Sequence, residues 1–465
     1  MQQPPNQANT TTGPTVQERR TARLFAYLNG GIWAVGNGLV STYLIIFLAL
    51  EYDAPGLGLG IGMLLASPRL IGVLRLFVPA AIGRLTGRKS FCIACFLLSG
   101  LTLLFIVPIA AGRFGDGNRA VVALVVVWGV YHLFQYFATI ALWSWLGEIA
   151  RFRLRSRFFG IRERWMVLGQ AIAMLASGAI VWMWKELLPR SDQWIAYAVS
   201  TCMGVCYMLL AIVPLCQLRS CYRSRKALAA DSETNKGAAD EGRISIANYF
   251  APFRDERFLR LLLFGVFFAI ACGLTQAPQN VFPRRVLGVS LFVVLGLKTW
   301  MRLGQWTLGP FAGRYADRRG NLLVLIAGLL ITATGTLFYL PAQSSGSWLW
   351  LIGAWTVWIG WVLVNVTLPS IVLRSSPRGA DTPHIALYYA LTDLSLALAT
   401  IAGGWLFDNI GRGHGTVLHL PTLGSIDYYT YSFIAGWILR SLAAILFFVL
   451  LRKMIDRPEP MINKT

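Results

Sequence analysis

The sequence predicts an all-α integral membrane protein in which twelve transmembrane helices form two pseudo-symmetric six-helix bundles. Three observations lead to this fold class: twelve long apolar runs, a composition that is 56% hydrophobic and only 14% charged, and basic residues concentrated on one side of the runs. A helix needs roughly 20 apolar residues to cross the hydrocarbon core of a bilayer. Because lipid cannot satisfy an unpaired backbone group, runs of this length are expected to be helical.

The first half of the chain is expected to contain a tail and six spans. Residues 1–22 are rich in Gln, Thr, Pro and Asn and are expected to form a disordered tail, without the apolar core and cleavage site of a signal peptide. Residues 23–217 are expected to form the first six-helix bundle. Its spans are residues 24–50, 57–81, 90–111, 118–146, 161–184 and 193–217.

The second half repeats this organisation after a polar linker. Residues 218–257 are expected to be a linker with a flexible centre and an aromatic, charged end that lies along the membrane surface. Residues 258–452 are expected to form the second bundle, and residues 453–465 a short tail. The six spans of this bundle are residues 258–283, 289–312, 321–341, 347–373, 384–407 and 430–451.

The distribution of Lys and Arg predicts the orientation of the chain. Only seven of the 42 Lys and Arg residues fall in the expected outer loops and five lie within spans, whereas the rest lie in or next to the tails and inner loops. This bias is typical of cytoplasmic segments and places both termini in the cytoplasm. We expect a multi-pass monomer in a bacterial inner membrane or a plasma membrane.

Composition and motifs also exclude several functions. A net charge of +21 can indicate a nucleic-acid partner, but here the orientation of the spans and attraction to anionic headgroups explain it, so we expect no nucleic acid. The sequence lacks the GxxxxGK[ST], HExxH and GxSxG motifs, so we expect neither an enzyme nor a cofactor. Cys92 and Cys95 have CxxC spacing but lie in an apolar run without a second ligand pair, so we expect no metal site.

Two short basic segments in equivalent positions indicate an internal repeat. One follows the second span, and the other, GRYADRRGN, follows the eighth and fits the signature G-x-L-A-D-R-x-G-R/N. The first copy is shortened and lacks the central acid. The residues that carry the match are Gly83, Leu85, Gly87, Arg88 and Lys89 in the first copy, and Gly313, Ala316, Asp317, Arg318, Gly320 and Asn321 in the second. On these residues and the hydropathy pattern, the chain resembles the major facilitator superfamily over about residues 20–455.

This resemblance implies a carrier whose two bundles rock around a central site near mid-membrane. It implies that the loop around Asp317 latches the inner side closed, where the alternative is a solvated turn. It also implies that the second span packs against the eleventh and the fifth against the eighth. Spans one, four, seven and ten line the central cavity in this family.

Charged residues within the spans need an explanation, because a charge near mid-bilayer costs at least about 2.5–3.5 kcal/mol. Arg69 and Lys298 lie at matching depths in the second and eighth spans, and Arg302 is one turn from Lys298. Asp393 is the clearest acid at this depth. The surplus of cations favours anion binding, whereas pairing with acids is the structural alternative. Asp393 is expected to form a gate with Arg75, or else to be a proton site.

Polar and aromatic residues recur at helical spacing in the spans that would line the cavity. Hydrogen bonds between helices are the alternative explanation, at about 0.6 kcal/mol each. The candidates are Asn29 and Trp33 in the first span, Trp128, His132 and Gln135 in the fourth, Gln276 and Asn280 in the seventh, and Trp358, Trp361 and Asn365 in the tenth.

We therefore expect a secondary active transporter that moves a small solute by alternating access, and we favour a small organic or inorganic anion. Its partners would be the lipid bilayer, the substrate and a coupling ion such as a proton. One alternative is a proton-coupled exporter of drugs or neutral solutes. The other is a membrane sensor or assembly factor of the same fold that does not transport.

Overall fold

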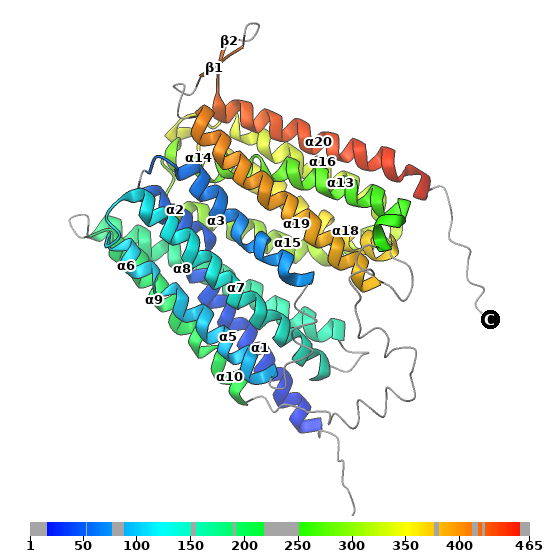
Figure 1. Ribbon diagram of the computed structural model, residues 1–465, viewed down its shortest axis with the longest axis horizontal. Coiled ribbons are helices and arrows are strands. Elements are labelled where there is room, and N and C mark those ends of the chain that lie inside the picture. The colour runs from blue at the N-terminus through cyan, green and yellow to red at the C-terminus, as the bar shows by residue number, and fades with distance from the viewer. Residues whose placement is uncertain are drawn as a thin grey trace, which may run out of the picture.

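The computed structural model describes residues 16–52, 54–76, 88–149, 155–188, 192–217, 251–375, 381–411, 417–420 and 424–455. Helices make up nearly all of this part of the chain (Figure 1). The expected N-terminal tail, the centre of the linker and the end of the C-terminal tail lie largely outside the described residues.

The first half contains six spans, several of them divided into two helical pieces. The spans are α1 (Val16–Leu39) with α2 (Thr42–Glu51), α3 (Leu57–Gly72) with a 3-10 turn (Val73–Leu76), α5 (Arg88–Leu103) with α6 (Ile106–Ala110), α7 (Gly117–Ile149), α8 (Arg155–Leu187), and α9 (Trp194–Leu210) with α10 (Ile212–Gln217).

The second half also contains six spans, preceded by a 3-10 turn (Ala251–Arg254). They are α13 (Glu256–Gly273) with α14 (Gln276–Arg285), α15 (Leu291–Arg319), α16 (Asn321–Thr334) with a 3-10 turn (Gly335–Tyr339), α17 (Trp350–Val357) and α18 (Trp361–Ser375) around a 3-10 turn (Trp358–Gly360), α19 (Asp381–Leu406) with a π-helical turn (Phe407–Gly411), and α20 (Tyr428–Ile455). A 3-10 turn (Ser345–Ser347) precedes α17.

These elements confirm the all-α membrane fold with twelve spans. Ten helical segments of the described chain are long and apolar enough to cross a membrane. The remaining two are α3, which is apolar but only 16 residues long, and α15, which has 29 residues but carries Lys298 and Arg302. A small antiparallel hairpin, β1 (Val417–Leu420) with β2 (Gly424–Asp427), lies between α19 and α20 and was not predicted.

The first span is interrupted at mid-length, where α1 ends at Leu39 and α2 begins at Thr42. The side chain of Ser41 accepts a hydrogen bond from the backbone N–H of Leu44, so it caps the start of α2. The carbonyl of Leu39 accepts hydrogen bonds from the hydroxyl groups of Ser177 and Ser200, at 3.0 and 2.9 Å. Backbone groups freed by the break are thus satisfied inside the protein, as a lipid environment requires.

The seventh span, which is the equivalent of the first in the second half, is also interrupted, between α13 and α14. Thr275 occupies the break and donates to the carbonyl of Cys272. It accepts hydrogen bonds from Gln279 and, from α20, Arg440. Paired interruptions of this kind are typical of the transport site in secondary carriers.

The segment Gly313–Arg319 corrects one prediction. It was expected to be a loop, but it forms the last two turns of α15, and the connection to α16 is Gly320 alone. No residue between Gly313 and Arg319 breaks a helix, whereas Gly320 has a φ of +87°, a conformation that favours glycine. The eighth span is therefore longer than the predicted residues 289–312.

The helices form two sets that approach each other at one end (Figure 1). We call the end at which α1 begins and α20 finishes the terminal face, and the opposite end, which carries β1 and β2, the far face. Buried apolar residues of the first half form one continuous core with Phe282, Trp355 and Phe433 from the far-face half of the second set. The terminal-face half of the second set has a separate core that includes Phe258 and Phe447. The two sets therefore share a core only toward the far face.

Candidate functional site

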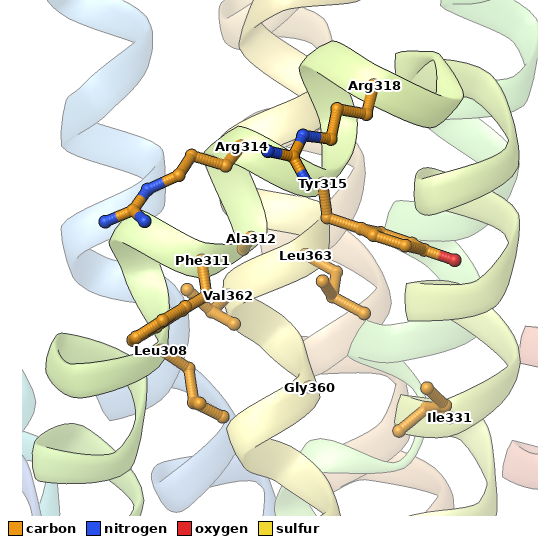
Figure 2. Close-up of a pocket in the computed structure, with 10 residues that line it drawn as sticks. All are labelled: Leu308, Phe311, Ala312, Arg314, Tyr315, Arg318, Ile331, Gly360, Val362 and Leu363. Carbon is orange, nitrogen blue, oxygen red and sulfur yellow. The ribbon is translucent and has the colours of Figure 1, made fainter.

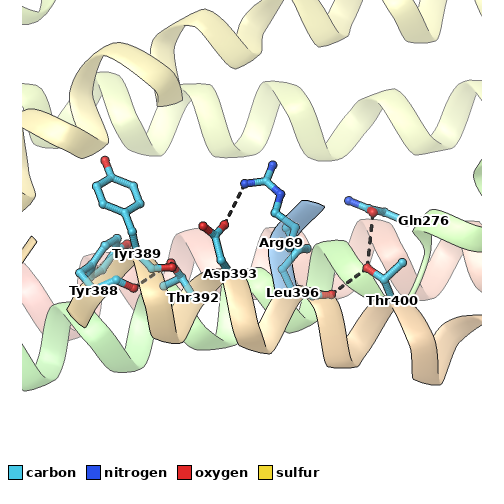
Figure 3. A network of polar contacts seen from close by, with 8 residues as sticks. All are labelled: Arg69, Gln276, Tyr388, Tyr389, Thr392, Asp393, Leu396 and Thr400. Carbon is cyan, nitrogen blue, oxygen red and sulfur yellow. Dashed lines mark hydrogen bonds and ion pairs between the residues drawn. The ribbon is translucent and has the colours of Figure 1, made fainter. Parts of the chain in front are cut away.

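An ion pair joins the two sets of helices near the middle of the membrane. The Nη1 atom of Arg69, on α3, lies 2.8 Å from Oδ1 of Asp393, on α19. The Asp393 side chain is 11% exposed, whereas that of Arg69 is 53% exposed. Figure 3 shows the Arg69, Asp393 and Tyr389 side chains pointing to the same side of α19. The guanidinium of Arg69 is therefore partly open to another ligand.

The sequence suggested Arg75 as a gate partner of Asp393, with pairing of Asp393 to a cation such as Arg69 as the structural alternative. The structure has the bond to Arg69, which lies one and a half turns before Arg75. The side chain of Arg75 is outside the described residues, so its contact with Asp393 stays a prediction. A Cβ atom at Gly72 would lie 3.4 Å from Oδ2 of Asp393, so α3 passes directly beside this carboxylate. The pairing thus depends on the rotation of α3 against α19, which the hydropathy pattern does not determine.

Lys298 lies between aromatic rings contributed by both sets of helices. Its Nζ atom is 5.6 Å from the ring centroid of Tyr43, on α2, and 5.5 Å from that of Trp355, on α17. The two rings are themselves 6.2 Å apart. Cation–π contacts of this length stabilise a partly buried ammonium group. They leave its hydrogen-bonding capacity largely unused, since an aromatic face accepts only weakly.

Arg302 lies one helical turn closer to the terminal face than Lys298, and its side chain is exposed. Among the described residues, neither Arg302 nor Lys298 forms an ion pair with an acid. Within the described residues, Lys298 and Arg302 thus lack an acidic partner, while the mid-membrane acid Asp393 is engaged by Arg69.

Arg440, on α20, is a further buried cation and is only 4% exposed. Its Nη2 atom donates to Oγ1 of Thr275 at 2.9 Å, in the break of the seventh span. The guanidinium is placed at the C-terminal end of α13, where the helix dipole is negative. It stabilises the break and does not extend to the membrane interface.

Candidates from the first half are mostly engaged within that half. Asn29 is 1% exposed and donates to the carbonyl of Ala211, at the junction of α9 and α10. Trp33 is buried against Phe96, with ring centroids 4.4 Å apart. Trp128 is buried and stacks edge-on with His132, at 4.6 Å.

His132 and Gln135, on the same face of α7, are partly exposed. Asn37, on α1, is also partly exposed.

In the second half, too, some candidate side chains are engaged in hydrogen bonds within the protein and others are accessible. The hydroxyl of Thr400 donates to Oε1 of Gln276, as Figure 3 shows, and Asn280 donates to the carbonyl of Gln276. Trp358 is buried and donates to the carbonyl of Thr332.

Trp361 is partly exposed and contacts Phe268, while Asn365, one turn further along α18, is exposed. Asn365 is thus available to a ligand in a way that Trp358 is not.

The far face is closed by an acid that the sequence did not single out. Glu51 ends α2, and its Oε1 atom lies 3.0 Å from Nζ of Lys185 and 3.3 Å from Nη2 of Arg284. Lys185 belongs to the first set of helices and Arg284 to the second, so this carboxylate bridges them. Arg285 also donates to the carbonyl of Leu50. Next to Glu51, burial raises the pKa of Tyr52 to about 12, and the phenol donates to the carbonyl of Ile109.

A second acid at the far face caps a helix of the opposite set. Asp408, in the π-helical turn after α19, accepts hydrogen bonds from the backbone N–H groups of Gly58 and Leu59, at 2.8 and 2.7 Å. These groups belong to the first turn of α3, whose own cap residue, Gly56, has no side chain to offer. In the sequence, Gly56 indicates that α3 starts without a side-chain cap of its own. It does not identify Asp408 as the residue that supplies one.

The residues expected to latch the terminal face are not engaged. Asp317 and Arg318 are exposed, and Asp317 makes no ion pair or hydrogen bond within the described chain. Gly313 and Gly320 lie within and at the end of α15. Gly83 lies outside the described residues, and Arg88 begins α5 with its side chain undescribed.

The comparisons with known proteins agree with this fold. The family model described as Major Facilitator Superfamily matches residues 26–400. No curated protein sequence matches the chain. A point mutant of the nucleoside transporter NupG is 12% identical, with a TM-score of 0.62 over 93% of this chain and 99% of that one. A D-xylose–proton symporter is 16% identical, with a TM-score of 0.60 over 92% and 96%.

A bacterial homologue of the human lysosomal transporter Spinster, solved in an inward-facing and unoccupied conformation, is 15% identical. Its TM-score is 0.59 over 96% of this chain and 100% of that one. At these identities the solved structures establish a shared fold.

Proposed function

Because the chain belongs to the Major Facilitator Superfamily of secondary transporters, and is not an enzyme, we propose that it carries a small organic or inorganic anion across the membrane. The substrate would bind between the two bundles, against Arg69, Lys298 and Arg302. The observation that carries the proposal is the excess of cations over acids at this depth, in a part of the protein where an unpaired charge is unfavourable.

An anion would use these three residues in different ways. Arg69 has an exposed guanidinium that can bind a carboxylate or phosphate by two parallel hydrogen bonds. Arg302 is exposed and unpaired within the described chain, and Lys298 beside it adds a charge that the rings of Tyr43 and Trp355 hold in place. His132, Gln135, Trp361 and Asn365 are the neighbouring candidates that remain accessible to a solute.

Asp393 would couple binding to the movement of the bundles. An anion that binds Arg69 competes with the carboxylate of Asp393 for the same guanidinium. Loss of the ion pair would loosen the contact between α3 and α19, and a proton taken up by Asp393 would neutralise the released charge. This sequence of events supports symport of an anion with a proton.

The conformation supports alternating access. The bundles are joined at the far face by Glu51, Arg284 and Asp408, whereas Asp317 at the terminal face is unengaged. If the basic tails and loops lie in the cytoplasm, as their charge predicts, the protein is open toward the cytoplasm.

The test is a thermal-shift assay of the purified protein with anionic, neutral and cationic solutes. The expected result is stabilisation by an anion, which falls when Arg69, Lys298 or Arg302 is replaced by Gln. Loss of a hydrogen bond to a charged group corresponds to at least about tenfold weaker binding. Arg257→Gln is the control, since it removes an exposed positive charge from the first turn of α13, away from the proposed site. Equal shifts in all four variants would contradict an anion site.

Proton-coupled export of a neutral solute is the second candidate. It is favoured by the position of Asp393, an acid that pairs with Arg69 across the two bundles near mid-membrane. In that case a neutral solute would stabilise the protein, and Lys298→Gln would leave the shift unchanged. A sensor that does not transport would show no solute-dependent change in the accessibility of either face.

A further inference from the structure

A groove on the second bundle lies apart from the charged residues between the bundles. It has a volume of about 560 Å³. Leu308, Phe311 and Tyr315 of α15 form one side, Ile331 of α16 forms the other, and Leu363 of α18 lies between them (Figure 2). All five side chains present apolar surface, so the body of the groove favours an apolar ligand.

The groove faces a different direction from the proposed transport site. At about 100° per residue, Leu308, Phe311 and Tyr315 lie on average roughly 130° around α15 from Lys298 and Arg302. Phe311 is 61% exposed and Tyr315 is 54% exposed. Exposed apolar side chains on the outside of a membrane-spanning bundle contact lipid, so the groove opens to the bilayer and not to the space between the bundles.

The length of the groove matches one leaflet. The ten residue steps from Leu308 to Arg318 rise about 15 Å along α15, which is half of the hydrocarbon thickness of about 30 Å. An acyl chain of a single leaflet spans this distance. The groove therefore extends along α15 by about the thickness of one leaflet, on the terminal-face side of Lys298 and Arg302.

Two arginines stand at the headgroup end of the groove. Arg314 and Arg318 line it, both are exposed, and the guanidinium of Arg314 lies 5.3 Å from the ring centroid of Phe311 (Figure 2). Asp317 lies about 180° around the helix from Leu308, so it faces away from the groove. The charge at this end is thus positive, at the depth where lipid phosphates are found.

We infer that this groove binds one anionic phospholipid from the leaflet at the terminal face. Its acyl chain lies against Leu308, Phe311 and Ile331, and its phosphate lies between Arg314 and Arg318. A zwitterionic lipid carries its own cation next to the phosphate and gains less from these two arginines. The inference is independent of the transported solute, because the groove and the proposed transport site share no residue.

The test is a lipid titration of the purified protein, followed by native mass spectrometry. Phosphatidylglycerol is expected to bind more tightly than phosphatidylcholine with the same acyl chains. In the variant Arg314→Gln/Arg318→Gln the affinity for phosphatidylglycerol should fall about 25-fold, or about fivefold for each arginine removed. In Ile331→Trp the ring fills the groove without a change of charge, so binding should weaken as well.

The matched control is Arg254→Gln/Arg257→Gln, which removes two exposed positive charges at the terminal face, one from the 3-10 turn before α13 and one from the first turn of α13. This variant should bind phosphatidylglycerol as the parent protein does. Equal binding of the two lipids, equal loss in the control, or unchanged binding in Ile331→Trp would each overturn the inference.

Discussion

Asp408, at the end of α19, accepts a hydrogen bond of 2.8 Å from the backbone N–H of Gly58, at the start of α3 in the other bundle. The N–H of Leu59 donates to the second oxygen of the same carboxylate. One bundle therefore supplies the N-cap of a helix in the other, and its negative charge lies at the positive end of the helix dipole.

We expect Asp408→Ala to favour opening of the far face, because the cap and both hydrogen bonds are lost. Helix caps contribute about 0.5–2 kcal/mol, so the open population should rise several-fold. The measurement is the distance between spin labels at residues 114 and 345, both exposed near the far face, in a protein without native cysteines. Asp408→Asn retains one acceptor and should have a smaller effect. A distance distribution unchanged in both variants would contradict this role.

The close approach of α3 and α19 gives a second prediction. A Cβ atom at Gly404 would lie 2.3 Å from the carbonyl oxygen of Gly58, a distance that backbone atoms cannot accommodate. Gly404→Ala should therefore separate the two helices and destabilise the protein by about 1–3 kcal/mol. Thermal unfolding measures this loss. Gly129→Ala is the control, since nothing lies within 4 Å of its added methyl group, and an equal loss there would refute the packing explanation.

Removal of the Asp393 carboxylate gives a third prediction. In Asp393→Asn the guanidinium of Arg69 no longer has an anionic partner, so an anionic substrate should bind more tightly. We expect about a fivefold increase, less than the roughly tenfold of a buried charged hydrogen bond, because the Arg69 side chain is half exposed and screened by solvent. Equilibrium binding measures it. Asp317→Asn, which removes an exposed and unengaged acid, should leave the affinity unchanged, and weaker binding in Asp393→Asn would count against competition for Arg69.

A fourth prediction concerns the buried cation of α20. Arg440→Gln should destabilise the protein by about 1–3 kcal/mol, because Thr275 loses a charged donor at the break between α13 and α14. Arg440→Lys keeps the charge near the end of α13 and should be closer to the parent. Thermal unfolding of the purified variants compares them. If Lys and Gln destabilise equally, the charge at the helix end is not what stabilises the break.

The spans could be predicted from the sequence because lipid imposes a single requirement on length and apolar content. The interruptions of the first and seventh spans could not be predicted from the sequence. Val40 and Ser41 are unremarkable inside a helix, and the interruption there depends on Ser177 and Ser200, which come from other spans and satisfy the carbonyl of Leu39.

The sequence predicts which residues lie at the depth of the candidate site, but not which of them contact each other. The depth of Arg69, Lys298 and Asp393 follows from counting along each span, whereas the pairing of Asp393 with Arg69 depends on how α3 is rotated. Likewise, helical spacing places Asn29 and Trp33 on a polar face, but it does not distinguish a face toward α9 and α5 from one toward a solute.

The carboxylate of Asp408 holds two amide groups of neighbouring residues, and these amides belong to one rigid turn. A rotation that lengthens one bond lengthens the other, so they break together. This contact between the bundles is for that reason lost as a unit, as expected of a switch between discrete arrangements.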